Sequence, residues 1–255
     1  MVCIGGGLLG LEVAGAVARQ GAQVTVLEGL DWLLPRQLDA QASAILKEKI
    51  EELGIKVIVP AMTKALHGDV KVQSVELADG QVLPADLVLI STGVSANLEL
   101  AKSAGLDVNR GVLVNEHMLT SNPDILAAGD LTEFQGRSYG LWIPAKNQGT
   151  IAGQNAVGKE ASFLGDPPST RLKVLGVDVF SIGQFSPSQD GDRLVAESKD
   201  GIYQSFLFRE GKMIGSILLG DASMANKVKA AIEGKRDFTA LLGENVDLES
   251  IIRAL

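Results

Sequence analysis

The first 28 residues follow a strand–helix–strand pattern of apolar and polar positions. Apolar residues 1–4 predict a buried strand, and the run Gly5-Gly6-Gly7-Leu8-Leu9-Gly10 follows it directly. An alanine-rich stretch then predicts a helix that ends at Gly21, since glycine commonly terminates helices. Residues 24–27 are apolar again and are followed by the acidic Glu28. The pattern predicts a βαβ unit, and therefore an α/β fold with a parallel sheet.

Beyond Glu28 the pattern predicts further elements of the same sheet and an antiparallel flap. The predicted elements are a helix over 38–53, a strand over 55–59, a hairpin over 71–82 and a strand over 87–90. The hairpin prediction depends on Asp79-Gly80, because this dipeptide tolerates the positive φ angles of tight turns. The continuous apolar run 87–90 is typical of a strand that is covered on both faces. It ends at Ser91-Thr92-Gly93, whose small side chains allow another close backbone approach.

The second half of the chain has a different composition and predicts two further domains. Its predicted helices cover 97–105, 144–158, 222–234 and 248–255, and its predicted strands cover 112–114, 172–174, 177–180, 203–208 and 213–219. Another strand is predicted to end on Gly129-Asp130, and Asp166-Pro167-Pro168 is the best candidate for a linker. We therefore divide the chain into domains over residues 1–95, 96–165 and 166–255.

The glycine spacing G-x-G-x-x-G, in this strand–helix–strand context, predicts a dinucleotide-binding site. Gly5 allows the tight turn out of the strand, Gly7 lets the backbone approach a pyrophosphate, and Gly10 lets the helix lie close to the sheet. The free N–H groups of the first helical turn then face an anion. Glu28 is placed to accept hydrogen bonds from the adenosine ribose, and its charge would repel a 2′-phosphate. NADH is therefore expected to bind in preference to NADPH, and Glu28→Arg to shift that preference toward NADPH.

Composition narrows the possible partners. The formal net charge of −8 argues against nucleic acid and anionic membranes. No stretch of eighteen consecutive apolar residues occurs, so no membrane partner is expected and the protein is predicted to be cytoplasmic.

The single cysteine, Cys3, excludes an intrachain disulfide, a Cys-ligated iron–sulfur cluster and a zinc ribbon, and no metal site is predicted. Because the sequence starts inside a core strand, we expect the chain to continue upstream in its natural context.

Three motifs together carry a family resemblance: Gly5-x-Gly7-x-x-Gly10-x-Glu12, Thr92-Gly93, and the stretch from Thr120 to Asp130 that reads T-x-x-P-x-I-x-A-x-G-D. In this order they resemble the FAD-dependent pyridine nucleotide–disulfide oxidoreductase superfamily. Residues 34–39 and 169–180 are similar to NADH:rubredoxin reductases and to the flavoprotein part of assimilatory nitrite reductase large subunits. The resemblance implies a Rossmann-like NAD domain with an antiparallel flap, the second half of a split FAD domain, and a C-terminal α+β interface-type domain.

The resemblance also implies roles for individual residues. Those implied to hold NAD are Gly5, Gly7, Leu8, Leu9, Gly10 and Glu28. Glu12 matches the family's acid near the nicotinamide and is the predicted catalytic residue, and Gly93 matches the backbone approach beside the same ring. Gly129 and Asp130 would meet the flavin ribityl chain, and the helix start containing Ala145 and Gln148 would direct its positive end at the flavin. Judged without the resemblance, Glu12 is equally an ordinary acid in a first helical turn, and Asp130 a helix cap.

The sequence departs from the family at its beginning. In the family, a first half of the FAD domain with its own glycine fingerprint precedes the NAD domain, and that half is absent here. FAD is therefore expected to bind only if the missing half is supplied. We interpret the chain as part of an NADH-dependent flavoprotein oxidoreductase. In the whole enzyme, hydride would pass from NADH to FAD, and electrons would pass on to a rubredoxin-like or nitrite-reductase-type acceptor.

Two other interpretations stay open from the sequence. The chain could be a non-catalytic NAD-binding or dimerisation module that lacks its own flavin, which the missing half supports. It could also be a dehydrogenase that uses NAD directly on a small substrate, but the sequence offers no catalytic histidine, Tyr-Lys pair or metal cluster for this. Phe180, Phe185, Phe206 and Phe208 predict an apolar packing face near the C-terminus, and a homodimer is expected from it and from the resemblance.

Overall fold

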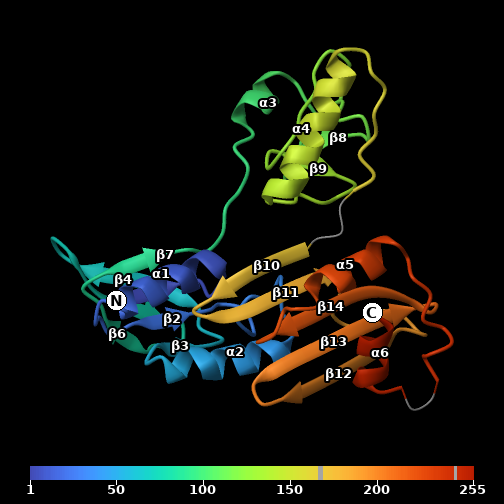
Figure 1. Cartoon of the computed structure of the whole chain (residues 1–255). Coiled ribbons are helices and arrows are strands. Elements are labelled where there is room, and N and C mark those ends of the chain that lie inside the picture. Colours follow the sequence, from blue (N-terminus) through green and yellow to red (C-terminus); the bar gives the residue numbers. More distant parts are fainter. Residues whose placement is uncertain (166–168, 244–245) are drawn as a thin grey trace. The chain divides into compact units, whose positions relative to one another are not determined.

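The computed structural model describes residues 1–165, 169–243 and 246–255. The chain forms two compact units, of which one combines Met1–Gly93 with Ser169–Leu255 and the other contains Val94–Pro168 (Figure 1). The first and last segments of the chain form a single unit. The division into three functional domains stays a prediction. The predicted linker Asp166-Pro167-Pro168 lies outside the described residues.

The first unit contains a four-stranded parallel sheet in the order β3-β2-β1-β7 (Figure 1). Its strands are β1 (Val2–Ile4), β2 (Thr25–Leu27), β3 (Lys56–Ile58) and β7 (Val88–Ile90), and its helices are α1 (Leu8–Ala18) and α2 (Ala40–Glu52). Both helices pack into one core with Cys3, Val26 and Val57 from one face of the sheet. The predicted βαβ unit, second helix and third strand are confirmed.

A three-stranded antiparallel flap shares a core with the opposite face of this sheet. Its strands are β4 (Thr63–Gly68), β5 (Val72–Leu77) and β6 (Val82–Pro84). Val75 and Leu83 of the flap pack with Val2 and Leu27 of the parallel sheet. The predicted Asp79-Gly80 hairpin between β5 and β6 is confirmed. The sequence does not predict β4, because two register shifts in its pairing with β5 interrupt the alternation of apolar and polar positions.

The strand β7 is more exposed than its apolar run predicts. Leu87 is 52% and Ile90 is 62% exposed, so the expectation of a strand covered on both faces is wrong for the described residues. The physical reason is its position, because β7 lies at the edge of the sheet beside β1 and the flap core extends only to Val88.

The first unit also contains a five-stranded antiparallel sheet in the order β10-β11-β14-β13-β12. Its strands are β10 (Ser169–Val174), β11 (Val177–Gly183), β12 (Arg193–Lys199), β13 (Ile202–Arg209) and β14 (Lys212–Leu219), and its helices are α5 (Ala225–Glu233) and α6 (Leu248–Ala254). Four of these strands and both helices are confirmed predictions. The sequence does not predict β12, since this edge strand is mostly exposed and lacks a regular apolar alternation.

Both faces of this sheet are covered within the chain. One face contributes Tyr203 to the core that contains α1 and α2, and the partly buried Phe185 packs against that core. On the other face, Phe180, Phe206 and Phe208 pack with α5 and α6 and are 3%, 0% and 1% exposed. The phenylalanine face is therefore an internal packing surface, and it gives no support to the predicted homodimer.

The second unit contains short elements around a small aromatic core. The elements are α3 (Glu99–Ser103), β8 (Val112–Val114), β9 (Thr132–Phe134) and α4 (Trp142–Ala156). The predicted strand ending on Gly129-Asp130 is wrong, because Leu126 forms only an isolated bridge with Leu119 and the strand β9 follows the Gly-Asp pair. The helix α4 begins two residues before the predicted start at residue 144. In the described ranges, no helix has the length and apolar character that a membrane crossing requires.

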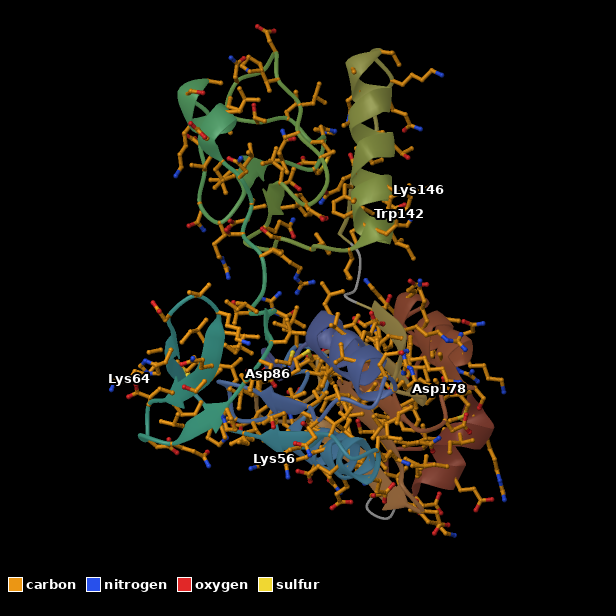
Figure 2. The ribbon with its side chains drawn as sticks, turned by 90° about the vertical axis from the view of Figure 1, so that its left-hand side faces the viewer. Lys56, Lys64, Asp86, Trp142, Lys146 and Asp178 are labelled. Carbon is orange, nitrogen blue, oxygen red and sulfur yellow. The ribbon has the colours of Figure 1, made fainter. Side chains whose placement is uncertain are left out.

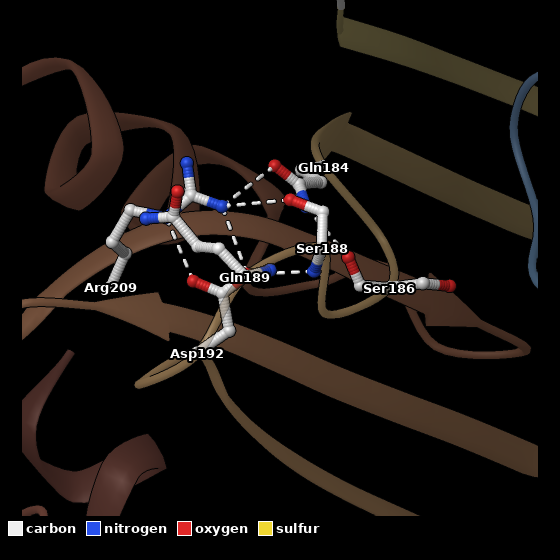
Figure 3. A network of polar contacts seen from close by, with 6 residues as sticks. All are labelled: Gln184, Ser186, Ser188, Gln189, Asp192 and Arg209. Atoms are coloured by element: carbon white, nitrogen blue, oxygen red, sulfur yellow. Dashed lines mark hydrogen bonds and ion pairs between the residues drawn. The ribbon is translucent and has the colours of Figure 1, made fainter.

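A buried carboxylate fixes the loop between β11 and β12 (Figure 3). Asp192 accepts hydrogen bonds from Arg209 Nε at 2.8 Å and Nη2 at 2.9 Å, and from the backbone N–H groups of Ser188 at 2.8 Å and Gln189 at 3.3 Å. Its side chain is fully buried. The Arg209 side chain, followed by the Ser188 N–H, holds the pKa of Asp192 well below its usual range.

This depressed pKa predicts a loss of stability in acid. Because the folded pKa of Asp192 lies below the unfolded value of about 4, its contribution is complete above that value and disappears as pH falls toward the folded pKa. We expect Asp192→Asn to unfold at a lower temperature than the wild type at pH 7, and the difference to shrink as pH falls below about 4. Thermal unfolding followed by circular dichroism measures this, and a difference independent of pH would contradict it.

Candidate functional site

The glycine turn lies at the carboxyl ends of the parallel strands. Gly5 follows β1 and donates its N–H to Leu27 O at the end of β2 at 2.7 Å, while Ser91 follows β7 and donates to Ile4 O at 2.7 Å. In open α/β sheets, ligands bind outside the carboxyl ends of the strands. The structure therefore brings the predicted Gly5–Gly10 turn, Glu28 and the Ser91–Gly93 segment to one edge of the sheet.

The three motif glycines have different physical roles. Gly5 has a φ of +114°, and a Cβ on it would lie 2.1 Å from Ser91 O. A Cβ on Gly10 would lie 2.1 Å from Gly5 O, so this glycine allows α1 to approach the turn. A Cβ on Gly7 would meet none of the described residues within 4 Å. Gly5 and Gly10 are thus required by the fold, whereas Gly7 leaves its space open to a ligand.

The first turn of α1 presents its backbone donors beside Gly7. Gly7 is the N-cap, and the first intrahelical bond runs from Leu11 N to Gly7 O at 3.0 Å. The N–H groups of Leu8 and Leu9 therefore precede the helical hydrogen-bond ladder, and Leu9 is 65% exposed. Together with the positive end of the helix dipole, they form a site suited to a phosphate or pyrophosphate.

The Glu28 carboxylate holds the glycine turn through hydrogen bonds to backbone N–H groups. Its side chain is 8% exposed, with Oε2 accepting the Gly6 N–H at 2.9 Å and Oε1 accepting the Leu30 N–H at 2.8 Å. A carboxylate oxygen has two lone pairs, so each keeps capacity for a further donor such as a ribose hydroxyl. The sequence placed Glu28 at a ribose site, but it did not predict that this carboxylate also organises the turn.

Two further predicted residues of this unit lie at exposed positions. Glu12 is on the exposed side of α1, two residues after Gly10. Gly93 follows β7 with a φ of +105°, and a Cβ on it would meet none of the described residues within 4 Å. The open space is compatible with a ligand approaching the Gly93 backbone, and the roles of Glu12 and Gly93 near a nicotinamide stay predictions.

In the second unit, Gln148 holds the Gly129-Asp130 turn. Gly129 has a φ of +89° and donates its N–H to Gln148 Oε1 at 2.8 Å, and Thr132 Oγ1 also contacts this oxygen at 2.8 Å. The Gln148 residue is 1% exposed, and its Nε2 has no hydrogen-bond partner in the described part of the chain. A buried donor without a partner, on the side chain that holds the turn, fits a site that a polar group completes, and the next residue of the turn, Asp130, is exposed.

The N-terminus of α4 differs from the prediction in detail. Its N-cap is Leu141, without a side-chain cap bond, so Asp130 does not cap this helix. Ala145 already donates its N–H to Leu141 O at 3.1 Å, which leaves the N–H groups of Trp142 and Ile143 as free donors of the first turn. Trp142 is 81% exposed. It lies on this first turn of α4, where Figure 2 labels it. The positive end of α4 is therefore available to an anionic group, but not through Ala145.

Sequence reasoning missed the residues that support the glycine turn. Leu33 and Leu34 are fully buried, and Leu34 donates its N–H to Gly6 O at 3.2 Å. A Cβ on Gly6 would lie 2.4 Å from Leu33 Cδ2, so position 6 requires glycine for packing. The available signal was the high apolar content of the loop after Glu28, in which Leu30 and Trp32 precede this pair.

The chain matches two known family models and is similar in sequence to known proteins. Residues 1–149 match the family model described as pyridine nucleotide-disulphide oxidoreductase, and residues 168–236 match the rubredoxin NAD+ reductase C-terminal domain. The chain is 36% identical over 238 residues to an NAD(P)H nitrite reductase of Bacillus subtilis, covering 92% of this chain and 30% of that protein. It is 33% identical over 235 residues to the NADH-rubredoxin oxidoreductase of Clostridium acetobutylicum, covering 92% of this chain and 58% of that protein.

Solved structures of known proteins have a fold similar to that of this chain. The crystal structure of the NADH:rubredoxin oxidoreductase from Clostridium acetobutylicum matches with a TM-score of 0.76 at 30% identity, over 100% of this chain and 62% of that chain. Putidaredoxin reductase, solved in a covalent complex with putidaredoxin, matches with a TM-score of 0.81 at 27% identity, over 99% of this chain and 63% of that chain. The chain thus spans less than two thirds of the length of these relatives. By its sequence and its fold, the chain belongs to the pyridine nucleotide-disulphide oxidoreductase family.

Proposed function

We propose that this chain is the NADH-binding part of a flavoprotein oxidoreductase that passes electrons to a rubredoxin-like or nitrite-reductase-type acceptor. The observation that carries the proposal is the open position at Gly7, next to the free N–H groups of the first turn of α1. Packing does not require glycine at position 7, because a Cβ there would meet none of the described residues within 4 Å. Both the open position and the free N–H groups are needed to bring a pyrophosphate against the backbone.

The residues of the first unit would bind and orient the nicotinamide nucleotide. The N–H groups of Leu8 and Leu9 would donate to the pyrophosphate, and the Glu28 carboxylate would accept from the ribose hydroxyls. Because Glu28 is a buried anion with both oxygens already hydrogen-bonded, a 2′-phosphate beside it would be repelled, which favours NADH over NADPH. Gly93 would let the backbone lie against the nicotinamide ring, with Glu12 near the same ring.

The second unit would supply part of a flavin site. Gly129, Asp130 and the free N–H groups at the start of α4 are the groups that would contact FAD, with Gln148 holding the turn in place. FAD, when bound, supplies the acceptor for hydride and releases electrons singly. The chain's own residues would bind and orient each cofactor within its own unit. Relatives named for rubredoxin, nitrite and a bound putidaredoxin support a small redox protein or a redox domain as the acceptor.

Titration calorimetry of the purified chain tests the proposal. NADH is expected to bind with a dissociation constant between about 1 µM and 1 mM, the range of most Michaelis constants, and NADPH more weakly. After incubation with FAD and gel filtration, little flavin should remain bound, because only part of the flavin contacts is present. No heat with millimolar NADH would refute the proposal, and a stable yellow protein would instead show a flavin site complete in this chain.

A further inference from the structure

Tyr203, in the five-stranded antiparallel sheet, forms a hydrogen bond with the N-cap residue of α2, a helix that packs on the parallel sheet. Tyr203 on β13 donates its hydroxyl to Asp39 Oδ2 at 2.7 Å, across 164 positions of sequence. The tyrosine is 1% exposed, and burial, followed by the hydrogen bond to Asp39, raises its pKa, so the phenol keeps its proton. Asp39 is the N-cap of α2, and its other oxygen accepts the Ala42 N–H at 2.8 Å. The two sheets are therefore joined by a directional bond as well as by apolar packing.

From Asp39 a short, partly buried loop leads to the glycine turn. Leu38 is 1% exposed and donates its N–H to Leu34 O at 2.9 Å. Leu34 has a φ of +50°, a strained value for a branched residue, and donates its N–H to Gly6 O at 3.2 Å. Gly6 in turn donates to Glu28 Oε2 at 2.9 Å. Strain of this kind persists only where surrounding contacts fix the backbone, and the Asp39 end of this loop is fixed by Tyr203.

A second contact from the antiparallel sheet reaches α1 itself. Leu175 and Gly176 form the turn between β10 and β11, with φ values of +50° and +91°. The Leu175 side chain packs so closely on α1 that a Cβ added to Gly15 would lie 1.6 Å from its Cδ2. The helix α1, whose N-terminus would bind the ligand, therefore packs against this turn.

We propose that Tyr203 is a positioning residue for the dinucleotide site. Its hydroxyl holds Asp39, and through residues 33–38 it fixes the Gly6 N–H against the Glu28 carboxylate before any ligand binds. The identity of the ligand as NADH rests on the function proposed above, but the coupling itself is a property of the ligand-free chain. The C-terminal sheet is then part of the nucleotide-binding unit and acts on its geometry.

Amide hydrogen exchange of the ligand-free, full-length chain tests the coupling. Tyr203→Phe removes only the hydroxyl, and it should accelerate exchange at the Gly6 and Leu30 amides relative to core amides of β14 such as Leu218, whose side chain lies in the other core. In calorimetry, the same variant should bind NADH about threefold to tenfold more weakly than the wild type. Asp39→Ser keeps a helix-capping oxygen but breaks the same bond, so it should give the same local acceleration without altering the C-terminal core.

Two controls separate positioning from general destabilisation. Tyr139→Phe, in the other unit, should leave exchange at Gly6 and Leu30 unchanged. In the Asp39→Ser background, Tyr203→Phe should add no further acceleration, because the path through Asp39 is already broken. Unchanged exchange at Gly6 and Leu30 in Tyr203→Phe, or an equal acceleration of all amides in the unit, would overturn the proposal. A wild-type chain that does not bind NADH would refute the proposed function, while exchange would still decide the coupling.

Discussion

Gly7→Ala is expected to weaken NADH binding about tenfold to a hundredfold without lowering the stability of the ligand-free chain. The added methyl group meets none of the described residues within 4 Å, and the φ of −77° and ψ of 177° at this N-cap suit alanine. With ligand present, the methyl group would hold the pyrophosphate away from the first turn of α1. Loss of one charge-assisted hydrogen bond, worth about 1.5–3 kcal/mol, accounts for the expected size.

Gly10→Ala is the matched comparison, because it carries the same methyl group in the same motif. Its Cβ would lie 2.1 Å from Gly5 O, so backbone must move, and overpacking of this kind costs about 1–3 kcal/mol of unfolding free energy. Denaturant unfolding and NADH calorimetry should therefore show loss of binding with loss of stability for Gly10→Ala, and loss of binding alone for Gly7→Ala. Unaltered NADH affinity in Gly7→Ala would place the ligand elsewhere.

Glu28→Ala is expected to reduce the free energy of unfolding by about 2–4 kcal/mol and to abolish measurable NADH binding. The substitution leaves the Gly6 and Leu30 N–H groups without their acceptors, and an unpaired buried donor costs about 1–3 kcal/mol. Glu48→Ala, at an exposed position of α2, is the control and should change neither quantity. Urea unfolding measures the first effect and calorimetry the second. A Glu28→Ala variant as stable as the wild type would show that these two bonds contribute little.

The same contacts change the expectation for Glu28→Arg. From the sequence alone, an arginine at this position would pair with the 2′-phosphate of NADPH, and the cofactor preference would shift from NADH toward NADPH. In the structure, arginine would remove both acceptors and place its charge at a site that is 8% exposed. We therefore expect this variant to lose stability before it gains NADPH affinity. The preference for NADH is better measured as the affinity ratio of NADH to NADPH in the wild-type chain.

The predicted flavin residues show where local patterns stop being informative. The T-x-x-P-x-I-x-A-x-G-D stretch singled out Gly129, but it did not predict the φ of +89° that this glycine adopts. It did not reveal that Gln148, nineteen positions later, accepts the Gly129 N–H, or that the helix begins at Trp142. A hydrogen bond between a turn and a side chain on a later helix leaves no periodic signal, so it could not be read from spacing.

The sequence by itself determined the βαβ unit, the positions of the motif glycines and Glu28, and the family. These depend on local backbone preferences and on the period of apolar positions, which neighbouring residues set. Only the tertiary structure decided that the first and last segments share one unit, that the phenylalanine face is internal, and that Tyr203 reaches Asp39. These outcomes depend on which surfaces meet, and contacts between residues far apart in sequence are selected by packing of the whole unit.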